Sequence, residues 1–114
     1  MVARPGFITL VVAVLALSFA GQGYAQDELR KTFFKDADAA LAAAEAANAE
    51  LLAPRAFERG QKEYSEAEDA LRRGRNIETV RANAADATQY FREAAEKASL
   101  AQTKFAQVLK SRQD

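Results

Sequence analysis

The sequence predicts an all-α protein, built as a small antiparallel bundle of three helices. Alanine, which has the highest helix propensity, fills 22 of the 89 positions from Gln26 to Asp114. The same stretch has a single proline, Pro54, and two glycines, Gly60 and Gly74, which is too few for an all-β protein. Apolar residues recur there every three or four positions, the spacing of helices that pack against one another.

Residues 1–25 are predicted to be an export signal. Arg4 supplies a positive charge ahead of an uncharged apolar run of 14 residues, and Gly23 and Ala25 stand where a signal peptidase cleaves. A retained membrane anchor is the less favoured interpretation, because a span needs about 20 apolar residues. The sequence has no cysteine that could carry a lipid anchor. We therefore expect residues 26–114 to form one helical domain in the periplasm, without stable membrane insertion.

The first helix is expected at about residues 27–52. Asp27 and Glu28 favour its N-terminal end, where the helix dipole is positive. The apolar stripe of this helix alternates steps of four and three, and it consists of Phe33, Ala37, Ala40, Ala44, Ala47 and Leu51.

The second helix is expected at about residues 54–73. Pro54 suits its first turn, where the missing N–H has no partner to lose. Gly60 lies on the apolar stripe and allows another helix to approach closely. Gly74 suits the left-handed residue that ends many helices. The large apolar residues of the stripe recur every seven positions: Phe57, Tyr64 and Leu71.

The third helix is expected at about residues 77–112, with Asn76 as its N-cap. A helix of that length measures about 54 Å, and its pattern resembles that of a coiled coil. We call its regularly spaced apolar positions the seam. The seam consists of Ile77, Val80, Ala84, Ala87, Phe91, Ala94, Ala98, Ala101, Phe105 and Val108.

Two arrangements of these helices are open. In the first, Pro54 breaks the chain and three antiparallel neighbours form a bundle, which leaves the end of the third helix overhanging. In the second, Pro54 only kinks one long helix, which pairs with the third helix as a hairpin and brings Phe105 to residues 41–44. We favour the bundle, because proline lacks the intrahelical donor and disfavours helix at Ala53.

The overhang is the predicted interaction surface. Its apolar residues exceed what a compact three-helix core covers, and they are Leu100, Phe105, Val108 and Leu109. We expect the protein to be a non-enzymatic, exported scaffold or interaction module of the cell envelope, which self-associates or binds a protein through this helix. The alternative is a periplasmic carrier that holds a lipid or another hydrophobic small molecule between its helices, among the aromatic side chains.

A basic cluster marks the second turn. Arg72, Arg73 and Arg75 could bind a phosphate, a lipid headgroup or an acidic partner. The plainer interpretation is that cations are stabilising at the C-terminal end of a helix, where the dipole is negative.

The composition excludes several kinds of chemistry. Without histidine or cysteine the common nucleophile–base pairs and thiolate or imidazole metal sites cannot form, so we expect no catalytic residue, no metal and no cofactor. Glu63, Glu66 and Asp69 share one stripe, and Glu93 lies near Lys97, but such carboxylates are typical of a solvated helix face. Without Arg4 the chain has 15 basic and 16 acidic residues, which gives no general attraction to nucleic acid.

The chain from about residue 37 to residue 106 resembles the bacterial domain-of-unknown-function 4398 family. The resemblance rests on the run Ala-Glu-Leu-Leu-Ala-Pro at 49–54 and on the alanine-spaced third helix. It implies a small helical domain of exported envelope proteins, in which members are lipoproteins or precede an OmpA-like wall-binding domain. It implies no activity that can be transferred to single residues. Further positions that match are Phe57, Tyr64, Ala67, Leu71, Gly74, Ala87, Ala94, Ala98 and Ala101.

Overall fold

The structure is a computed structural model, and it describes residues 27–113. The chain divides into two units, residues 1–32 and 33–114. In the first unit the described residues, 27–32, are helical. The predicted export signal, residues 1–25, lies outside the described residues.

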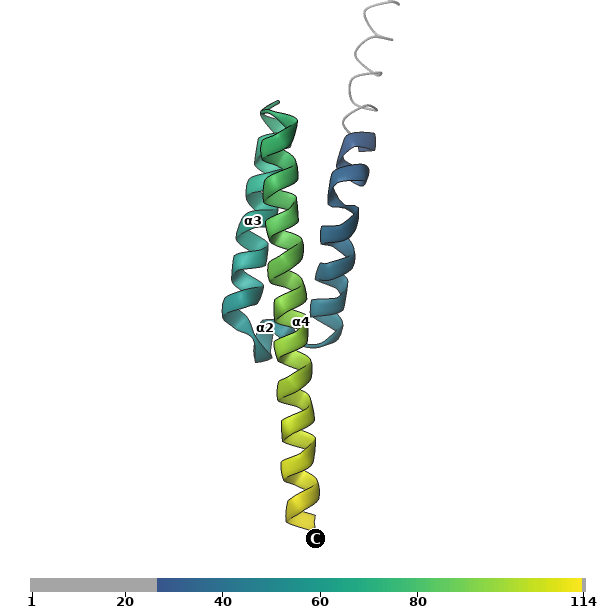
Figure 1. Cartoon of the computed structure of the whole chain (residues 1–114), viewed down its shortest axis with the longest axis vertical. Coiled ribbons are helices and arrows are strands. Elements are labelled where there is room, and N and C mark those ends of the chain that lie inside the picture. The colour runs from purple at the N-terminus through teal and green to yellow at the C-terminus, as the bar shows by residue number, and fades with distance from the viewer. Residues whose placement is uncertain (1–26, 114) are drawn as a thin grey trace, which may run out of the picture. The chain divides into compact units, whose positions relative to one another are not determined.

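The described part of the chain consists of helices and the turns between them, so the all-α prediction is confirmed. Residues 27–46 form the N-terminal helix, which is followed by a short helix α2, Ala49–Leu52. Two long helices complete the chain: α3, Pro54–Arg72, and α4, Ile77–Gln113. In the second unit α3 and α4 run antiparallel, and the helix that ends at residue 46 lies along α4 as the third member of the bundle (Figure 1).

The first helix is shorter than predicted, because it ends at residue 46 and does not continue to residue 52. Asn48 takes a left-handed backbone conformation, with φ 60° and ψ 38°. Asparagine is among the few residues besides glycine that adopt this conformation. The chain restarts as α2, and the expected stripe is wrong at its last member, since Leu51 is 81% exposed.

A second break separates α2 from α3 and confirms the three-helix bundle. Ala53 has φ −140° and ψ 59°, and Pro54 opens α3 as its first helical residue. The two breaks turn the chain back on itself, so that the rings of Phe34 and Tyr64 meet edge to face with centroids 5.0 Å apart. The kinked-hairpin alternative is therefore wrong, since it would have kept these two residues at opposite ends of one long helix.

The turn between α3 and α4 follows the local chemistry that the sequence predicts. Gly74 has φ 69°, its N–H donates to the Leu71 carbonyl oxygen at 3.1 Å, and the Arg75 N–H donates to the Ala70 carbonyl oxygen at 2.9 Å. These two bonds are those of a Schellman cap, which satisfies the last carbonyl groups of α3. The Asn76 side-chain oxygen then accepts from the Glu78 N–H at 3.0 Å and caps α4.

Alanine layers and a few aromatic rings fill the core. Phe34, Phe91 and Val80 are the largest side chains that are fully buried. The Phe91 ring lies with its centroid 5.6 Å from that of Phe57 and 6.4 Å from that of Tyr64. Each buried ring contributes about 1.5–3 kcal/mol through the apolar surface that it removes from water. The aromatic residues therefore act as packing residues of the bundle.

Gly60 leaves room on α3 for the Phe91 ring of α4. A Cβ atom at this position would lie 2.5 Å from Cδ1 and 2.6 Å from Cε1 of the Phe91 ring. No real Cβ atom sits that close, so the ring occupies the space that any larger residue would need. Gly60 therefore makes room for a side chain of α4, and the close approach of the two helix backbones stays a prediction.

Candidate functional site

The packing surface of α4 changes from buried to exposed along one helix. The helix continues past α2 and past the N-terminal end of α3, as the yellow end of the ribbon in Figure 1 shows. We call residues 99–113 the protruding segment. The seam residues before it are buried from Val80 onward: Val80, Ala84, Ala87, Phe91, Ala94 and Ala98.

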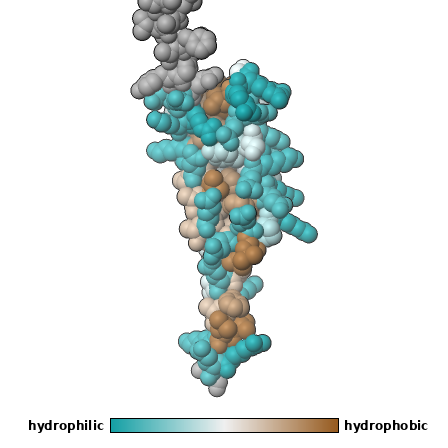
Figure 2. Space-filling view, turned by 180° about the vertical axis from the view of Figure 1, so that it is seen from behind, coloured by the Kyte–Doolittle hydropathy of each residue, from teal (hydrophilic) through white to brown (hydrophobic). Residues whose placement is uncertain are grey.

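The protruding segment carries the large apolar residues that the sequence marked as an interaction surface. The exposed fractions are 56% for Leu100, 65% for Phe105, 53% for Val108 and 46% for Leu109. Because positions 98, 101, 105 and 108 step by three and four, Phe105 and Val108 continue the helix face on which Ala98 is buried. Figure 2 shows apolar surface on this lower part of the molecule and a hydrophilic tip below it.

The turn beside the protruding segment forms the base of the bundle, which we define as residues 45–52. The side-chain amide of Gln102 donates a hydrogen bond of 2.8 Å to the Ala47 carbonyl oxygen. This bond satisfies a carbonyl group that the break at Asn48 leaves without a helical donor. Gln102 therefore fixes the first turn of the protruding segment against the base.

An open hollow lies in the base, and it is lined by Glu45, Asn48, Glu50 and Leu51. The two glutamates are exposed, and they lie next to the exposed leucine. The base therefore joins negative charge to apolar surface. The sequence does not predict this feature, because residues 49–52 have the composition of helix interior. Asn48 was the available signal, since an asparagine inside an alanine-rich helix is a candidate for a left-handed residue.

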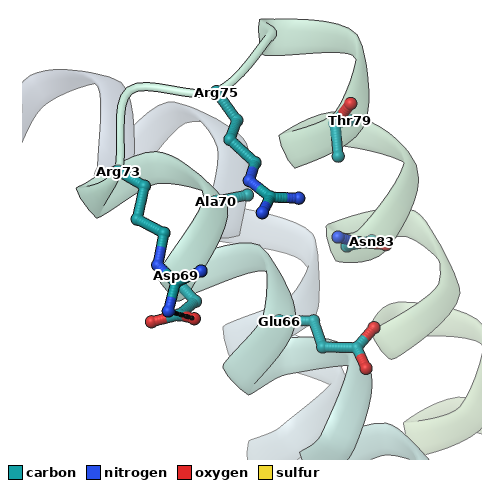
Figure 3. Close-up of a pocket in the computed structure, with 7 residues that line it drawn as sticks. All are labelled: Glu66, Asp69, Ala70, Arg73, Arg75, Thr79 and Asn83. Atoms are coloured by element: carbon teal, nitrogen blue, oxygen red, sulfur yellow. Dashed lines mark ion pairs between the residues drawn. The ribbon is translucent and has the colours of Figure 1, made fainter.

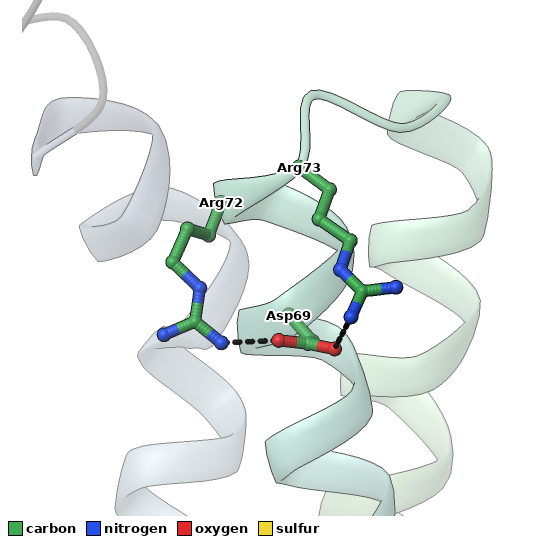
Figure 4. Close-up of polar contacts among 3 residues, drawn as sticks. All are labelled: Asp69, Arg72 and Arg73. Atoms are coloured by element: carbon green, nitrogen blue, oxygen red, sulfur yellow. Dashed lines mark hydrogen bonds and ion pairs between the residues drawn. The ribbon is translucent and has the colours of Figure 1, made fainter.

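Two of the three arginines at the second turn share one acidic partner. Arg72 donates a hydrogen bond to one carboxylate oxygen of Asp69, and Arg73 Nη2 lies 3.4 Å from the other (Figure 4). The Arg72 hydrogen bond, followed by the charge of Arg73, holds the pKa of Asp69 below its usual range. The contacts are solvent-exposed and contribute little to stability. Their geometry agrees with the plainer interpretation, that cations neutralise the end of α3.

Arg75 lines a hollow together with Arg73. Figure 3 shows it between α3 and α4, beside Thr79 and Asn83 of α4 and above Glu66 of α3. Together with Asp69 and Arg73, these residues line a hollow of about 150 Å³. The hollow holds carboxylates as well as guanidinium groups, so its charge does not select an anion.

The other candidate carboxylates lie on exposed or half-exposed helix faces. Partial burial, and then the charge of Glu66, raise the pKa of Glu63. Glu93 makes an ion pair of 2.9 Å with Lys97, four residues along α4. Such a pair supports an exposed helix by about 0.3–0.5 kcal/mol. Among the described residues, the chemistry that these carboxylates offer is that of a solvated surface.

Comparisons with known proteins identified no relative of this chain. No family model, no curated protein and no solved structure matches it. The resemblance to the domain-of-unknown-function 4398 family stays a prediction. None of the helices between residues 27 and 113 has the length and apolar character that a membrane crossing requires. The same residues contain no group of three or more His, Cys, Asp or Glu side chains that could hold a metal ion.

Proposed function

We propose that the protein is a non-enzymatic helical interaction module of the cell envelope, which binds a partner helix through the protruding segment. The observation that carries the proposal is the exposure of Phe105, Val108 and Leu109 on the face of α4 that is buried up to Ala98. A helix that packs through one face for about five turns and then leaves that face open has a surface suited to another helix.

The energetics support the same function. Exposed apolar side chains that stand singly are ordinary on protein surfaces, but these three are neighbours on one side of a helix. Phe105 alone offers a flat ring of the kind that dominates binding energies at interfaces. The segment is also already helical, so a partner does not have to order it on binding.

Export to the periplasm is part of the proposal, and it rests on the signal-like pattern of residues 1–25. If the pattern acts as a signal, the protein that accumulates in cells starts at Gln26. Intact-mass measurement of the protein from an exporting bacterial host tests this expectation. A mass that includes the first 25 residues would contradict cleavage.

The carrier alternative has less support. Phe57, Tyr64 and Phe91, which could have lined a pocket for an apolar ligand, contact one another in the core. The hollows beside α3 and at the base are lined mostly by charged and polar residues. Their lining does not suit a lipid chain.

Photo-crosslinking in the native host tests the interaction function. A photoreactive phenylalanine analogue replaces Phe105 in one strain and Gln89, an exposed residue in the bundle part of the same helix, in the control strain. We expect covalent adducts from position 105 and none above background from position 89. Equal yields at the two positions, or no adduct at either, would overturn the proposal.

A further inference from the structure

We propose that the partner helix is the protruding segment of a second copy of this chain, packed antiparallel about a two-fold axis. The inference rests on the proposed function, because it names the occupant of the same apolar surface. It is carried by the position of the base and by the charges at the base and at the end of α4.

The base limits how any helix can lie on the apolar surface. Phe105 and Val108 share a helix face with Ala98, and that face is covered by the bundle up to the level at which Gln102 contacts Ala47. A helix that packs on Phe105 and Val108 therefore ends against the base, at residues 45–52. The charges and the apolar surface of residues 45–52 then determine which kind of helix end can pack there.

The charges favour the tip of this same chain. The base presents Glu45 and Glu50 in one hollow. Residues 99–113 contain no aspartate or glutamate, and the tip carries Lys110 and Arg112. Arg112 is seven residues beyond Phe105, so it lies on the apolar face and points toward whatever occupies it. An antiparallel second copy brings this arginine to the glutamates of the base, where opposite charges favour association and fix the register.

The apolar residues match in the same register. Placing Arg112 of one copy opposite Gln102 of the other sets the two-fold axis at about position 107. Phe105 then lies opposite Leu109 of the second copy, and the two Val108 residues lie near the axis. Leu51, exposed in the base, lies beside the arriving tip. The interface is isologous, so every contact is made twice.

The antiparallel direction follows from the bundle itself. In a parallel pair the two bundles would stand at the same level and compete for the apolar side of α4. In an antiparallel pair they stand at opposite ends of the shared segment. The uncovered residues 99–113 of each copy, about 20 Å of helix, then pack against the same residues of the other copy.

Sedimentation equilibrium tests the inference on protein expressed from the complete coding sequence and purified as the exporting host processes it. We expect twice the mass of one chain, and Phe105→Glu should raise the dimer Kd at least about 30-fold. Gln89→Glu is the matched control and should leave Kd unchanged. A monomer at every concentration up to about 1 mM, or a dimer that Phe105→Glu does not weaken, would overturn the inference.

A charge exchange tests the contact between tip and base. Arg112→Glu should weaken the dimer roughly fivefold, and adding Glu45→Lys and Glu50→Lys to the same chain should restore it. Circular dichroism of each variant establishes that the helices are intact. Weakening without restoration would overturn the proposed register.

The crosslinking experiment separates failure of the inference from failure of the proposed function. An adduct from position 105 with twice the mass of the chain supports both. An adduct with any other protein would contradict the dimer but would still support the interaction function. The absence of any adduct would contradict both. A monomer that sediments with vesicles of anionic phospholipid, and loses this binding on Phe105→Glu, would overturn the inference in favour of a membrane surface.

Discussion

The two parts of α4 share one apolar pattern and differ in what covers it. Between Val80 and Ala98 the seam is buried under the N-terminal helix and α3, and in the protruding segment Phe105 and Val108 are exposed. The residue spacing is the same on both sides of this boundary. A helical pattern therefore specifies a face and its direction, whereas the lengths of the neighbouring helices decide how much of that face is covered.

The two parts also differ in the side chains that fill the pattern. The buried part is mostly alanine around one large ring, Phe91, and helices can approach closely over it. The protruding segment has larger residues with fewer alanines between them. A close-packed bundle tolerates few large side chains, whereas a short surface needs them to gain binding energy.

The largest expected effect separates two phenylalanines on the same helix. Phe91→Ala should lower the free energy of unfolding by about 3–5 kcal/mol, because it opens a cavity between α3 and α4. Phe105→Ala should change the unfolding of the monomer by less than about 0.5 kcal/mol, because the ring is exposed. Urea unfolding at protein concentrations below any dimer Kd measures both. Similar losses for the two variants would mean that the protruding segment is covered within one chain.

Substitution of Gly60 tests how tightly the buried part of α4 packs against α3. Alanine is a better helix former than glycine by about 1 kcal/mol, so Gly60→Ala would stabilise an exposed helix. Here the added methyl group meets the Phe91 ring, and we expect a net loss of about 1–3 kcal/mol. Ser65→Ala, at an exposed position of α3, is the control and should not destabilise. A more stable Gly60→Ala variant would contradict the close contact between α3 and α4.

Local chemistry allowed much of this fold to be predicted. Gly74 and Asn76 have side-chain and backbone properties that act within a few residues, so the cap that ends α3 and the cap that starts α4 were readable from the sequence. Pro54 was equally informative, because proline disfavours helix at the residue before it and suits the first turn of a new helix. The overhang followed from comparing the lengths of the second and third helices.

The base could not be predicted, because it depends on contacts between distant residues. Asn48 is a candidate for a left-handed residue, but it stands in a run of good helix formers, so the local sequence alone does not decide that the helix breaks there. The break is stabilised by Gln102, which lies 55 positions from the Ala47 carbonyl group that it caps, and by the burial of Ala49. Leu51 was therefore assigned to the core, and the hollow with Glu45 and Glu50 was missed.

A smaller loss of stability is expected where the buried and protruding parts of α4 meet, at Gln102. Gln102→Ala removes the hydrogen bond to Ala47 and leaves a carbonyl group at the base to be solvated, which should cost about 0.5–1.5 kcal/mol. Gln107→Ala, an exposed position in the same segment, is the control and should be nearly neutral. Hydrogen exchange should also show faster exchange at the Leu51 and Leu52 amides in the Gln102 variant. Unchanged exchange would mean that the turn holds without this cap.

The smallest effect concerns the polar end of the bundle, where Asp69 meets Arg72 and Arg73. Folding lowers the pKa of Asp69, and the hydrogen bond from Arg72 makes the largest contribution to this shift. The stabilisation is therefore present above the unfolded pKa of an aspartate and is lost as pH falls through the lower, folded value. Asp69→Asn should be slightly less stable than the parent at neutral pH, and the difference should vanish in acid. Urea midpoints between about pH 2 and pH 7 measure this, with Asp36→Asn as a control for the loss of one exposed charge. A difference that persists at the acid end would assign the effect to the geometry of the α3 terminus, because a protonated Asp69 no longer attracts the two arginines.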